Sequence, residues 1–453
     1  MRGPKFRIVA ALLALALVGA ACTGRDDDDT ATDEETDEEA AAGSSIDTAD
    51  CISDPTAEIE GNEIKLVSSY PQSGATAAFS QIARGWKAYF QMVNEAGGVE
   101  IAGENYTIVT EDKDDQYNPA TTAQNIDELV GVDGENAFAA FSVVGTANNL
   151  AIREQLGELC VPNLFAATGA PIMGSEDFPW TLGSSLSPYS LEGKAFADLL
   201  QDQLPEAKVA MLVQDDDYGR AYEESFRSAI EGTDIEVVKV EPYATGAAEV
   251  SAQITSLAAS GADAFFNGGT LLACPDALTK AQAAGWTPAI TWVSATCTSK
   301  TLMGVAGAAG DGVYSYTNLK DPLNPDWASD AAMMEYRETV AQYQPEADLD
   351  NGIVAYGWTQ GALLVEMLES AEAPTRLAVM EAMRNFEASE VGVLLPDVTV
   401  STGEGDAFLG EAYNVMQYEF TAPGAQNHFV LVGELTDVEG QTLDLTPEEL
   451  VNA

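Results

Sequence analysis

The sequence predicts an α/β fold of two Rossmann-like lobes joined by a multi-strand hinge. From residue 64 onward, short apolar runs typical of strands alternate with longer segments whose apolar residues recur at helical spacing. Ala137–Phe141 and Val161–Phe165 read as strands on either side of a helix at 147–159, which implies parallel neighbours and a right-handed crossover. After residue 312, helices come before strand-like runs, so we expect the chain to cross between the lobes more than once.

The first residues are predicted to be an export signal rather than part of the fold. Arg2, Lys5 and Arg7 form a basic n-region, and Ile8–Val18 is an apolar h-region too short to span a bilayer. Because Cys22 follows small residues, residues 1–21 resemble a bacterial lipoprotein signal. The resemblance implies a lipid on Cys22 and a location on the outer face of the cell membrane.

The alternative is ordinary cleavage near Ala21 and secretion as a soluble protein. Lipoprotein signals usually carry Leu or a similar apolar residue three positions before the cysteine, and Gly19 occupies that position here. We favour the lipoprotein, because a cysteine at position 22 has little other use.

Residues 22–60 are predicted to form an acidic, disordered tether. Between residues 26 and 50 the chain has twelve acids, no base, and Ile46 as its only large apolar residue. Such a segment cannot bury enough surface to fold, and its like charges keep it extended. On a lipid anchor it would hold the folded part away from the membrane.

The whole chain is acidic, with 73 Asp and Glu against 20 Lys and Arg and a net charge of −53. A nucleic-acid-binding function is excluded, because it needs a basic surface. The acids are spread along the chain, so they are no signature of a cationic ligand. A saline habitat, in which salt screens the self-repulsion, is one hypothesis for this composition.

Four cysteines remain beyond Cys22, which suggests disulfides in an exported chain. Three pairings are possible. Cys274 with Cys297 would close one strand–loop unit, and Cys51 with Cys160 would tie the chain start to the first lobe. With a single histidine, His428, we expect no Cys/His zinc site and no other metal.

The element pattern sets the predicted domain limits. The first lobe, at 61–182, has strands at 64–69, 106–110, 137–141 and 161–165 and helices at 79–96, 119–130 and 147–159. The second lobe, at 183–312, has strands at 208–214, 235–240, 263–267 and 289–294 and helices at 191–204, 222–230, 250–259 and 275–284. Residues 313–392 are expected to return to the first lobe, with a connecting strand at 313–317 and helices near 328–343, 352–371 and 376–386. Residues 393–453 are expected to complete the second lobe, with antiparallel strands at 413–420 and 429–435.

Small and hydroxyl residues follow two neighbouring strands of the first lobe. Ser142 to Thr146 follows one strand, and Ala166-Ala167-Thr168 follows the next. The carboxyl ends of parallel strands meet at one sheet edge, where open α/β folds bind ligands. Small residues leave backbone N–H groups uncovered at a helix start, and threonine hydroxyls add donors, so this edge suits a carboxylate. The alternative is that Thr146 only caps a helix.

Loops of the second lobe have the same character. Tyr218 lies in the Asp215–Gly219 turn after one strand, Thr270 follows another, and Ala295-Thr296 follows a third. These loops would converge on the first-lobe edge across the gap between the lobes, and such convergence favours a ligand cleft. The alternative for Tyr218 is a surface tyrosine packed on its own turn.

The chain resembles the type I solute-binding proteins of ABC transporters, in particular the branched-chain amino acid (Leu/Ile/Val)-binding family. The similar segments are SSYPQSGATAAFSQIARGWKAYFQMVNEAGGV, the segment from Val161-Pro162 to Thr168, FPWTLG, QDDDYG and YGWTQGALLVEML, which spread over residues 60–420. The resemblance implies the Venus-flytrap form of the fold, a small-molecule solute in the cleft, and ABC permease and ATPase subunits as partners. It also implies a monomer that needs no cofactor.

The same resemblance assigns roles to particular residues. A ligand carboxylate would be held by Gly145-Thr146 and Ala166-Ala167-Thr168, and Tyr218 would close over the ligand. An aromatic after the first strand matches Phe79. Amino-acid-binding members pair the ligand ammonium with a second-lobe acid, but the matching loop here is Ala295-Thr296, and Thr270 lies where the family has a second tyrosine.

This departure leaves the ligand open, because a buried ammonium without a counter-charge costs several kcal/mol. Either Asp215, Asp216 or another cleft acid takes over, or the ligand is an aromatic acid, an amide or another small carboxylate. We expect no enzyme, since the chain has no GxSxG, HExxH or GxxxxGK[ST] motif. The alternative to transport is a receptor domain that passes ligand binding to a signalling partner.

Overall fold

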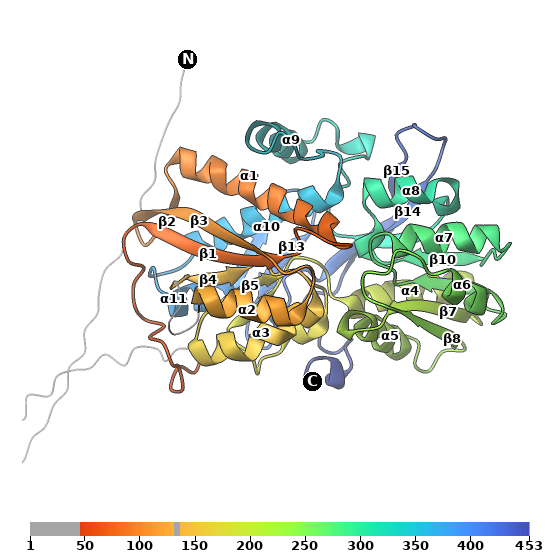
Figure 1. Cartoon of the computed structure of the whole chain (residues 1–453), viewed down its shortest axis with the longest axis horizontal. Helices are drawn as coiled ribbons and strands as arrows, with labels where there is room; N and C mark the ends of the chain where they lie inside the picture. Colours follow the sequence, from red (N-terminus) through yellow and green to blue (C-terminus); the bar gives the residue numbers. More distant parts are fainter. Residues whose placement is uncertain (1–45, 131–135, 453) are drawn as a thin grey trace, which may run out of the picture. The chain divides into compact units, whose positions relative to one another are not determined.

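The computed structural model describes residues 46–130 and 136–452 and contains two large β-sheets, each covered by helices (Figure 1). The predicted α/β architecture with two lobes is therefore confirmed. The predicted signal, Cys22 and the tether up to residue 45 lie outside the described residues. Within the described part, no helix combines the length and apolar character needed to cross a membrane.

The first lobe is built on a six-stranded sheet in which every pair of neighbours is parallel except β2 and β3. Parallel order follows from the alternation of strands and crossover helices along the chain. In sheet order the strands are β2 (Val99–Ile101), β3 (Glu104–Asp114), β1 (Glu63–Tyr70), β4 (Ala139–Phe141), β5 (Asn163–Ala166) and β6 (Thr181–Gly183).

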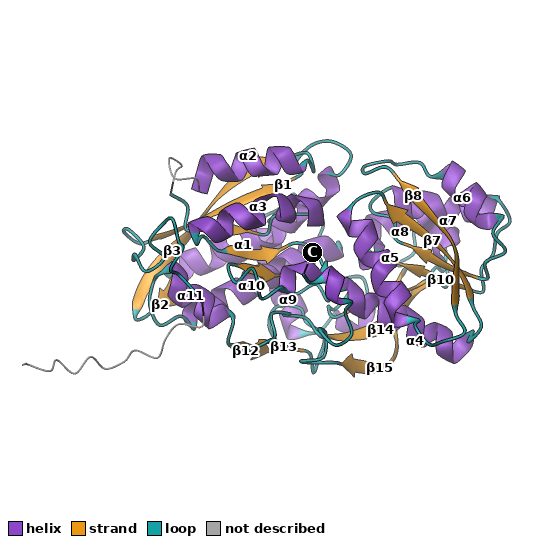
Figure 2. Ribbon diagram, turned by 90° about the horizontal axis from the view of Figure 1, so that it is seen from below, coloured by secondary structure: helices purple, strands orange, loops and turns teal. Residues whose placement is uncertain are grey.

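Helices bury both faces of this sheet (Figure 2). One close contact depends on glycine: a Cβ at Gly357 would lie 1.9 Å from the carbonyl oxygen of Ile82, so only glycine lets these two helices approach. The helices are α2 (Pro119–Val130) and α3 (Thr146–Leu159) on one face, α1 (Gln81–Ala96), α10 (Gly352–Glu369) and α11 (Arg376–Met383) on the other, and α9 (Ala331–Tyr343) packed on α1.

The second lobe is built on a seven-stranded sheet with four parallel and two antiparallel strand pairs. In sheet order these are β15 (His428–Asp437), β14 (Ala412–Glu419), β11 (Tyr314–Thr317), β10 (Ile290–Val293), β9 (Ala264–Asn267), β7 (Lys208–Gln214) and β8 (Glu236–Tyr243). Its helices are α4 (Tyr189–Gln203) and α5 (Asp217–Ala229) on one face, α6 (Ser251–Ala258) and α7 (Ala273–Ala283) on the other, and α8 (Lys300–Ala306) near the antiparallel end.

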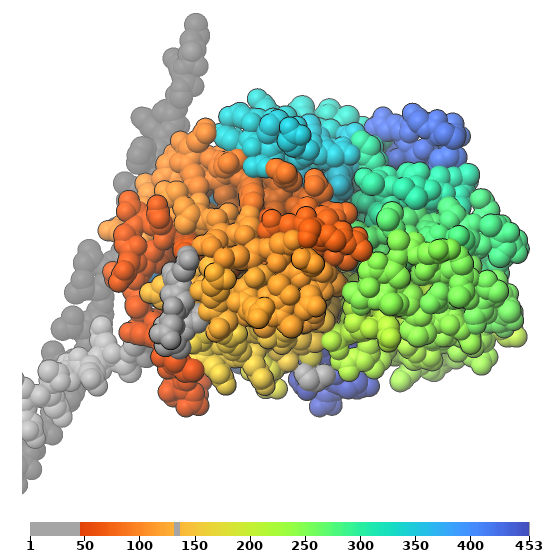
Figure 3. All heavy atoms as spheres, in the orientation of Figure 1, coloured from red at the N-terminus to blue at the C-terminus, as the bar shows by residue number. Residues whose placement is uncertain are grey.

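The segments that connect the two lobes lie side by side. The amide of Asn318 donates to the carbonyl oxygen of Ser185 at 2.6 Å, and the backbone N–H of Leu395 donates to the carbonyl oxygen of Asn318 at 2.8 Å. The lobes also meet at the loop before α1, as the space-filling view shows (Figure 3). A Cβ added at Gly246 of the second lobe would lie 3.5 Å from the Cβ of Ala75 in this loop. These adjacent connecting segments match the multi-strand hinge that the sequence predicts.

The structure differs from the sequence prediction at several element ends. The helix expected at 376–386 ends at Met383, and Phe386–Ser389 is strand β12, which pairs with β13 (Thr399–Thr402). The segment at 313–317 is not a connector, because β11 is hydrogen-bonded into the second sheet. Residues 391–400 bury their apolar side chains in the first-lobe core rather than in the second lobe.

The described end of the predicted tether packs against the first lobe. Ile46 is 3% exposed, and the backbone N–H of Ile52 donates to the carbonyl oxygen of Glu158 at 2.9 Å. A disulfide between Cys51 and Cys160 holds the same segment. Cys274 and Cys297 form the second disulfide. Of the three possible pairings, the structure therefore contains the one that joins Cys51 to Cys160 and Cys274 to Cys297.

Candidate functional site

A cavity of about 160 Å³ lies between the two lobes, and it collects most of the residues expected to bind a ligand. Two expected residues do not line it. Ser142 and Ala166 are almost completely buried beneath the first-lobe edge. The predicted residues that line the cavity are Phe79, Gly145, Thr146, Ala167, Thr168, Tyr218, Thr270, Ala295 and Thr296.

The first-lobe edge of the cavity is formed by the start of α3 and the end of β5. The hydroxyls of Thr146 and Thr168 are 2.8 Å apart, and Gly145 is the N-cap residue, so no side chain caps the first N–H groups of α3. Gly145 has φ 106°, and a Cβ there would lie 2.7 Å from the ring of Tyr117. Uncapped N–H groups beside two hydroxyls form an edge that favours an anion. Thr146 does not cap the helix.

Tyr218 forms part of the opposite wall, in the first turn of α5. Its hydroxyl lies 2.9 Å from Thr296 Oγ1 and 3.3 Å from Ser294 Oγ, and the residue is 3% exposed. Burial raises the pKa of Tyr218 well above its ordinary value of 10, so the phenol is neutral and can donate. The alternative of a surface tyrosine is wrong.

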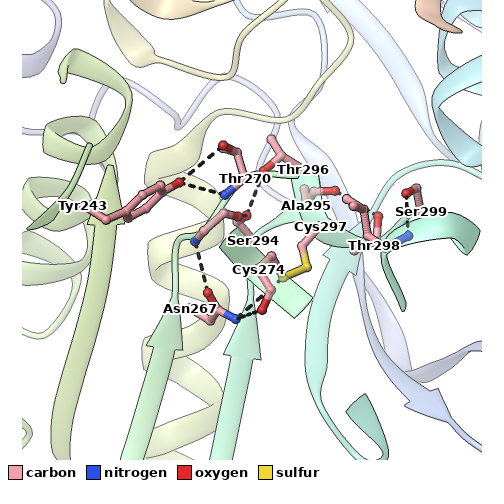
Figure 4. The surroundings of a disulfide bond; sticks show 12 residues. Tyr243, Asn267, Thr270, Cys274, Ser294, Ala295, Thr296, Cys297, Thr298 and Ser299 are labelled. Carbon is pink, nitrogen blue, oxygen red and sulfur yellow. Dashed lines mark hydrogen bonds between the residues drawn. A yellow bond between two sulfur atoms is a disulfide. The ribbon is translucent and has the colours of Figure 1, made fainter. Parts of the chain in front are cut away.

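A network behind Thr270 fixes the neighbouring loop. The Thr270 hydroxyl donates to Gln214 Oε1 at 3.0 Å, and its backbone N–H donates to the Tyr243 hydroxyl oxygen at 2.8 Å. The disulfide between Cys274 and Cys297 joins this loop to the turn that carries Ala295 to Ser299 (Figure 4). Two of the second-lobe segments that line the cavity, at Thr270 and at Ala295 to Ser299, are therefore covalently linked.

Sequence reasoning missed most of the aromatic lining. Tyr117, Tyr189, Tyr316 and Tyr356 line the cavity, and burial raises the pKa of each of these phenols. Tyr189 packs edge-to-face against Tyr218, with the ring centroids 5.4 Å apart. No local pattern distinguishes these tyrosines from core aromatics, because they reach the cavity from a loop, two helices and a strand.

Lys320 and Asp321 are the charged residues among those that line the cavity in the described part of the chain. The Lys320 ammonium is engaged, 2.9 Å from the Asp330 carboxylate. Asp321 accepts backbone N–H bonds from Leu323 at 2.9 Å and from Phe429 at 3.3 Å, and burial raises its pKa.

Asp215 and Asp216, the acids suggested by the sequence, do not line the cavity. Asp215 is exposed. The Asp216 carboxylate caps α5 by accepting from the backbone N–H of Gly219 at 3.2 Å, and it also accepts from the Gln214 amide. Neither carboxylate is placed to pair with a ligand ammonium in the cavity.

Known proteins share this fold. Leu/Ile/Val-binding protein homolog 3 of Brucella melitensis is 25% identical over 201 residues, which are 44% of this chain and 52% of that protein. The chain thus spans about half the length of the curated relative it matches. A branched chain amino acid ABC transporter from Thermus thermophilus with bound valine is 18% identical, with a TM-score of 0.71 over 83% of this chain and 97% of its own. A solute binding protein of R. palustris in complex with benzoate is 17% identical, with a TM-score of 0.65 over 83% of this chain and 98% of its own.

Two α/β lobes, each with a mainly parallel sheet, and a cavity between them match the architecture of the type I periplasmic binding proteins. The model of the periplasmic binding protein family matches residues 63–423, so the chain belongs to this family.

Proposed function

We propose that the protein is the extracytoplasmic solute-binding component of an ABC importer and that its solute is a small carboxylate without an α-ammonium. The composition of the cavity carries the proposal: hydroxyls and an uncapped helix start at one edge, aromatic walls, and Ala295-Thr296 in place of an acid. Family membership supports the importer role. Closure of the lobes on the solute would follow from contacts that the solute makes with both lobes.

The carboxylate would bind at the first-lobe edge. The Thr146 and Thr168 hydroxyls and the first N–H groups of α3 can all donate to it, and hydrogen bonds to charged groups are the stronger ones. Tyr218 would contact the solute from the second lobe. The remaining tyrosines, with Phe79 and Ile82, offer apolar surface to an aliphatic or aromatic body.

Among the described residues that line the cavity, no acid is free of other hydrogen bonds, and this supports the second part of the proposal, a solute without an α-ammonium. Asp321 is the one carboxylate among the described residues that line the cavity, and it already accepts two backbone N–H bonds. If an amino acid does bind, Asp321 is therefore the partner to test for its ammonium. Benzoate, bound by the R. palustris protein, is one carboxylate of the proposed kind.

A thermal-shift panel on the mature chain, meaning the chain without its predicted signal at residues 1–21, tests the ligand class. It holds benzoate, 4-methylpentanoate, leucine, valine, glutamate, acetamide and urea, with native mass spectrometry to identify any co-purified solute. We expect stabilisation by the simple carboxylates and none by the amino acids. Stabilisation by leucine that is lost in Asp321→Asn, but kept in the exposed control Asp215→Asn, would contradict the proposed class.

We also propose that a lipid on Cys22 anchors the protein. The basic and apolar segments before this cysteine and the acidic stretch after it support an anchor with a spacer. Cys22→Ala should move the protein from the membrane fraction to the soluble extracytoplasmic fraction. Recovery of Cys22→Ala in the membrane fraction would contradict the anchor.

A further inference from the structure

Glu192 is a buried carboxyl directly behind the second-lobe wall of the cavity. It lies in the first turn of α4, is completely buried, and does not line the cavity. Its Oε1 accepts from Trp292 Nε1 at 2.8 Å and from the backbone N–H of Ala295 at 3.2 Å, and its Oε2 accepts from the Tyr222 hydroxyl at 2.6 Å. A carboxyl without solvent is tolerated only where donors surround it in this way.

Two of these partners lead to the cavity. Ala295 lines the cavity, and the next residue, Thr296, holds the Tyr218 hydroxyl at 2.9 Å. Tyr222 stacks on Tyr189 with ring centroids 4.1 Å apart, and it meets Tyr218 edge-on at 5.0 Å. One carboxyl is thus bonded to both the aromatic part and the loop part of the same wall.

We propose that Glu192 is a positioning residue of the ligand site, which fixes the Tyr189–Tyr218 pair through Tyr222 and the Ala295-Thr296 turn through its backbone. This inference rests on the proposed function only in so far as the cavity is the binding site. Glu192 does not touch the solute. It acts by limiting the orientations that the wall can adopt, and preorganised walls bind more tightly.

The surroundings of Glu192 indicate which substitutions separate its shape from its charge. The titratable groups that face it are tyrosines: Tyr189 on its own helix, Tyr222 on α5 and Tyr316 on β11. Burial raises the pKa of Glu192 to about 7, although all three donors lower it. In Glu192→Gln the amide oxygen can accept from Trp292 and Ala295 while its NH₂ donates to the Tyr222 hydroxyl, so the wall keeps its position.

Affinities for benzoate and 4-methylpentanoate test the inference in a double-mutant cycle. We expect Glu192→Gln to bind within about threefold of wild type and Glu192→Leu at least about tenfold more weakly, because leucine leaves three buried donors unpaired. In a Tyr218→Phe background the loss from Glu192→Leu should shrink to under about threefold, since the two residues act on one wall. Asp198→Asn, an exposed change on the same helix, should bind as wild type.

A folded Glu192→Leu with wild-type affinity, or the same loss in both backgrounds, overturns the inference. If Glu192→Leu does not fold, Tyr222→Phe replaces it in the cycle, because this change removes one donor and keeps the stacked ring. The same two criteria then apply to it.

A ligand-free measurement distinguishes failure of this inference from failure of the proposed function. If neither solute binds wild type, the proposed ligand class fails, and NMR of the full chain labelled with ¹⁵N-Trp and ¹⁵N-Thr still tests Glu192. We expect the Trp292 indole and the Thr296 amide to shift together with pH in wild type and to stay fixed in Glu192→Gln. A Thr296 amide that stays fixed while the Trp292 indole shifts overturns the inference.

Discussion

Removal of the Thr146 hydroxyl is the most direct perturbation of the proposed carboxylate site. Thr146→Val keeps the shape of the side chain and deletes a hydroxyl whose partner is Thr168 Oγ1, 2.8 Å away. The residue is 1% exposed, so the lost bond should cost folding about 1 kcal/mol. A hydrogen bond to a charged solute is worth about 1.5–3 kcal/mol, so affinity should fall by about 10- to 150-fold.

Isothermal titration calorimetry with the solute that gives the largest thermal shift measures this loss. Thr255→Val is the matched control, because its hydroxyl makes one local bond, to the carbonyl oxygen of Ser251, on a helix away from the cavity. The reasoning is refuted if Thr146→Val is folded and binds within about twofold of wild type.

Three further outcomes follow from the same structure. Tyr218→Phe should weaken binding by about 0.5–1.5 kcal/mol in calorimetry, with little change in melting temperature. Tyr218→Ala should also destabilise the fold by about 3 kcal/mol or more, because the ring is buried. Equal melting temperatures of the two variants would contradict this prediction. Replacing both Cys274 and Cys297 by Ser opens a loop with a sequence separation of 23, so the unfolding free energy in denaturant should fall by about 3 kcal/mol. Calorimetry should also show weaker binding. Unchanged affinity would show that the linked loops are held in place without the disulfide. The folded-state pKa of Glu192, about 7, lies above its ordinary 4.5, so this group's contribution to stability is present below pH 4.5 and is lost as the pH rises through 7. Glu192→Gln should therefore remove at most about 3 kcal/mol of the pH dependence of the unfolding free energy between pH 4.5 and 8.5. Identical unfolding curves for the two proteins across this range would contradict the prediction.

Most of the fold could be predicted, because periodicity and turn residues agree along this chain. The strand expected at 208–214 and the helix expected at 119–130 match the structure to the residue. The short strands β2 and β6 were missed, since three residues carry too little pattern. The predicted helix end after Met383 was wrong, because the strand at Phe386–Ser389 is defined by pairing with β13, a contact distant in sequence.

The site could be predicted only in part, for a physical reason. Loops at the carboxyl ends of parallel strands converge by topology, and this brought Thr146, Thr168 and Tyr218 to the cavity. Tyr316 lies in β11 and Asp321 just after it. The sequence predicts a connecting strand there, so the position of these two residues at the cavity follows only from the sheet order. Glu192 reads as an ordinary helix acid, and its role depends on Tyr222, Trp292 and Ala295, which lie far from it in sequence.

The affinity ratio of 4-methylpentanoate to leucine tests the central claim most directly, since the two solutes differ only in the α-ammonium group. The cavity offers donors for the shared carboxylate. The one acid among the described residues that line it, Asp321, already accepts two backbone N–H bonds and so is not free to pair with the ammonium. An unpaired buried ammonium costs several kcal/mol, so calorimetry on the mature chain should show 4-methylpentanoate binding at least about 100-fold more tightly than leucine. Leucine binding as tightly as 4-methylpentanoate, or more tightly, would contradict the account.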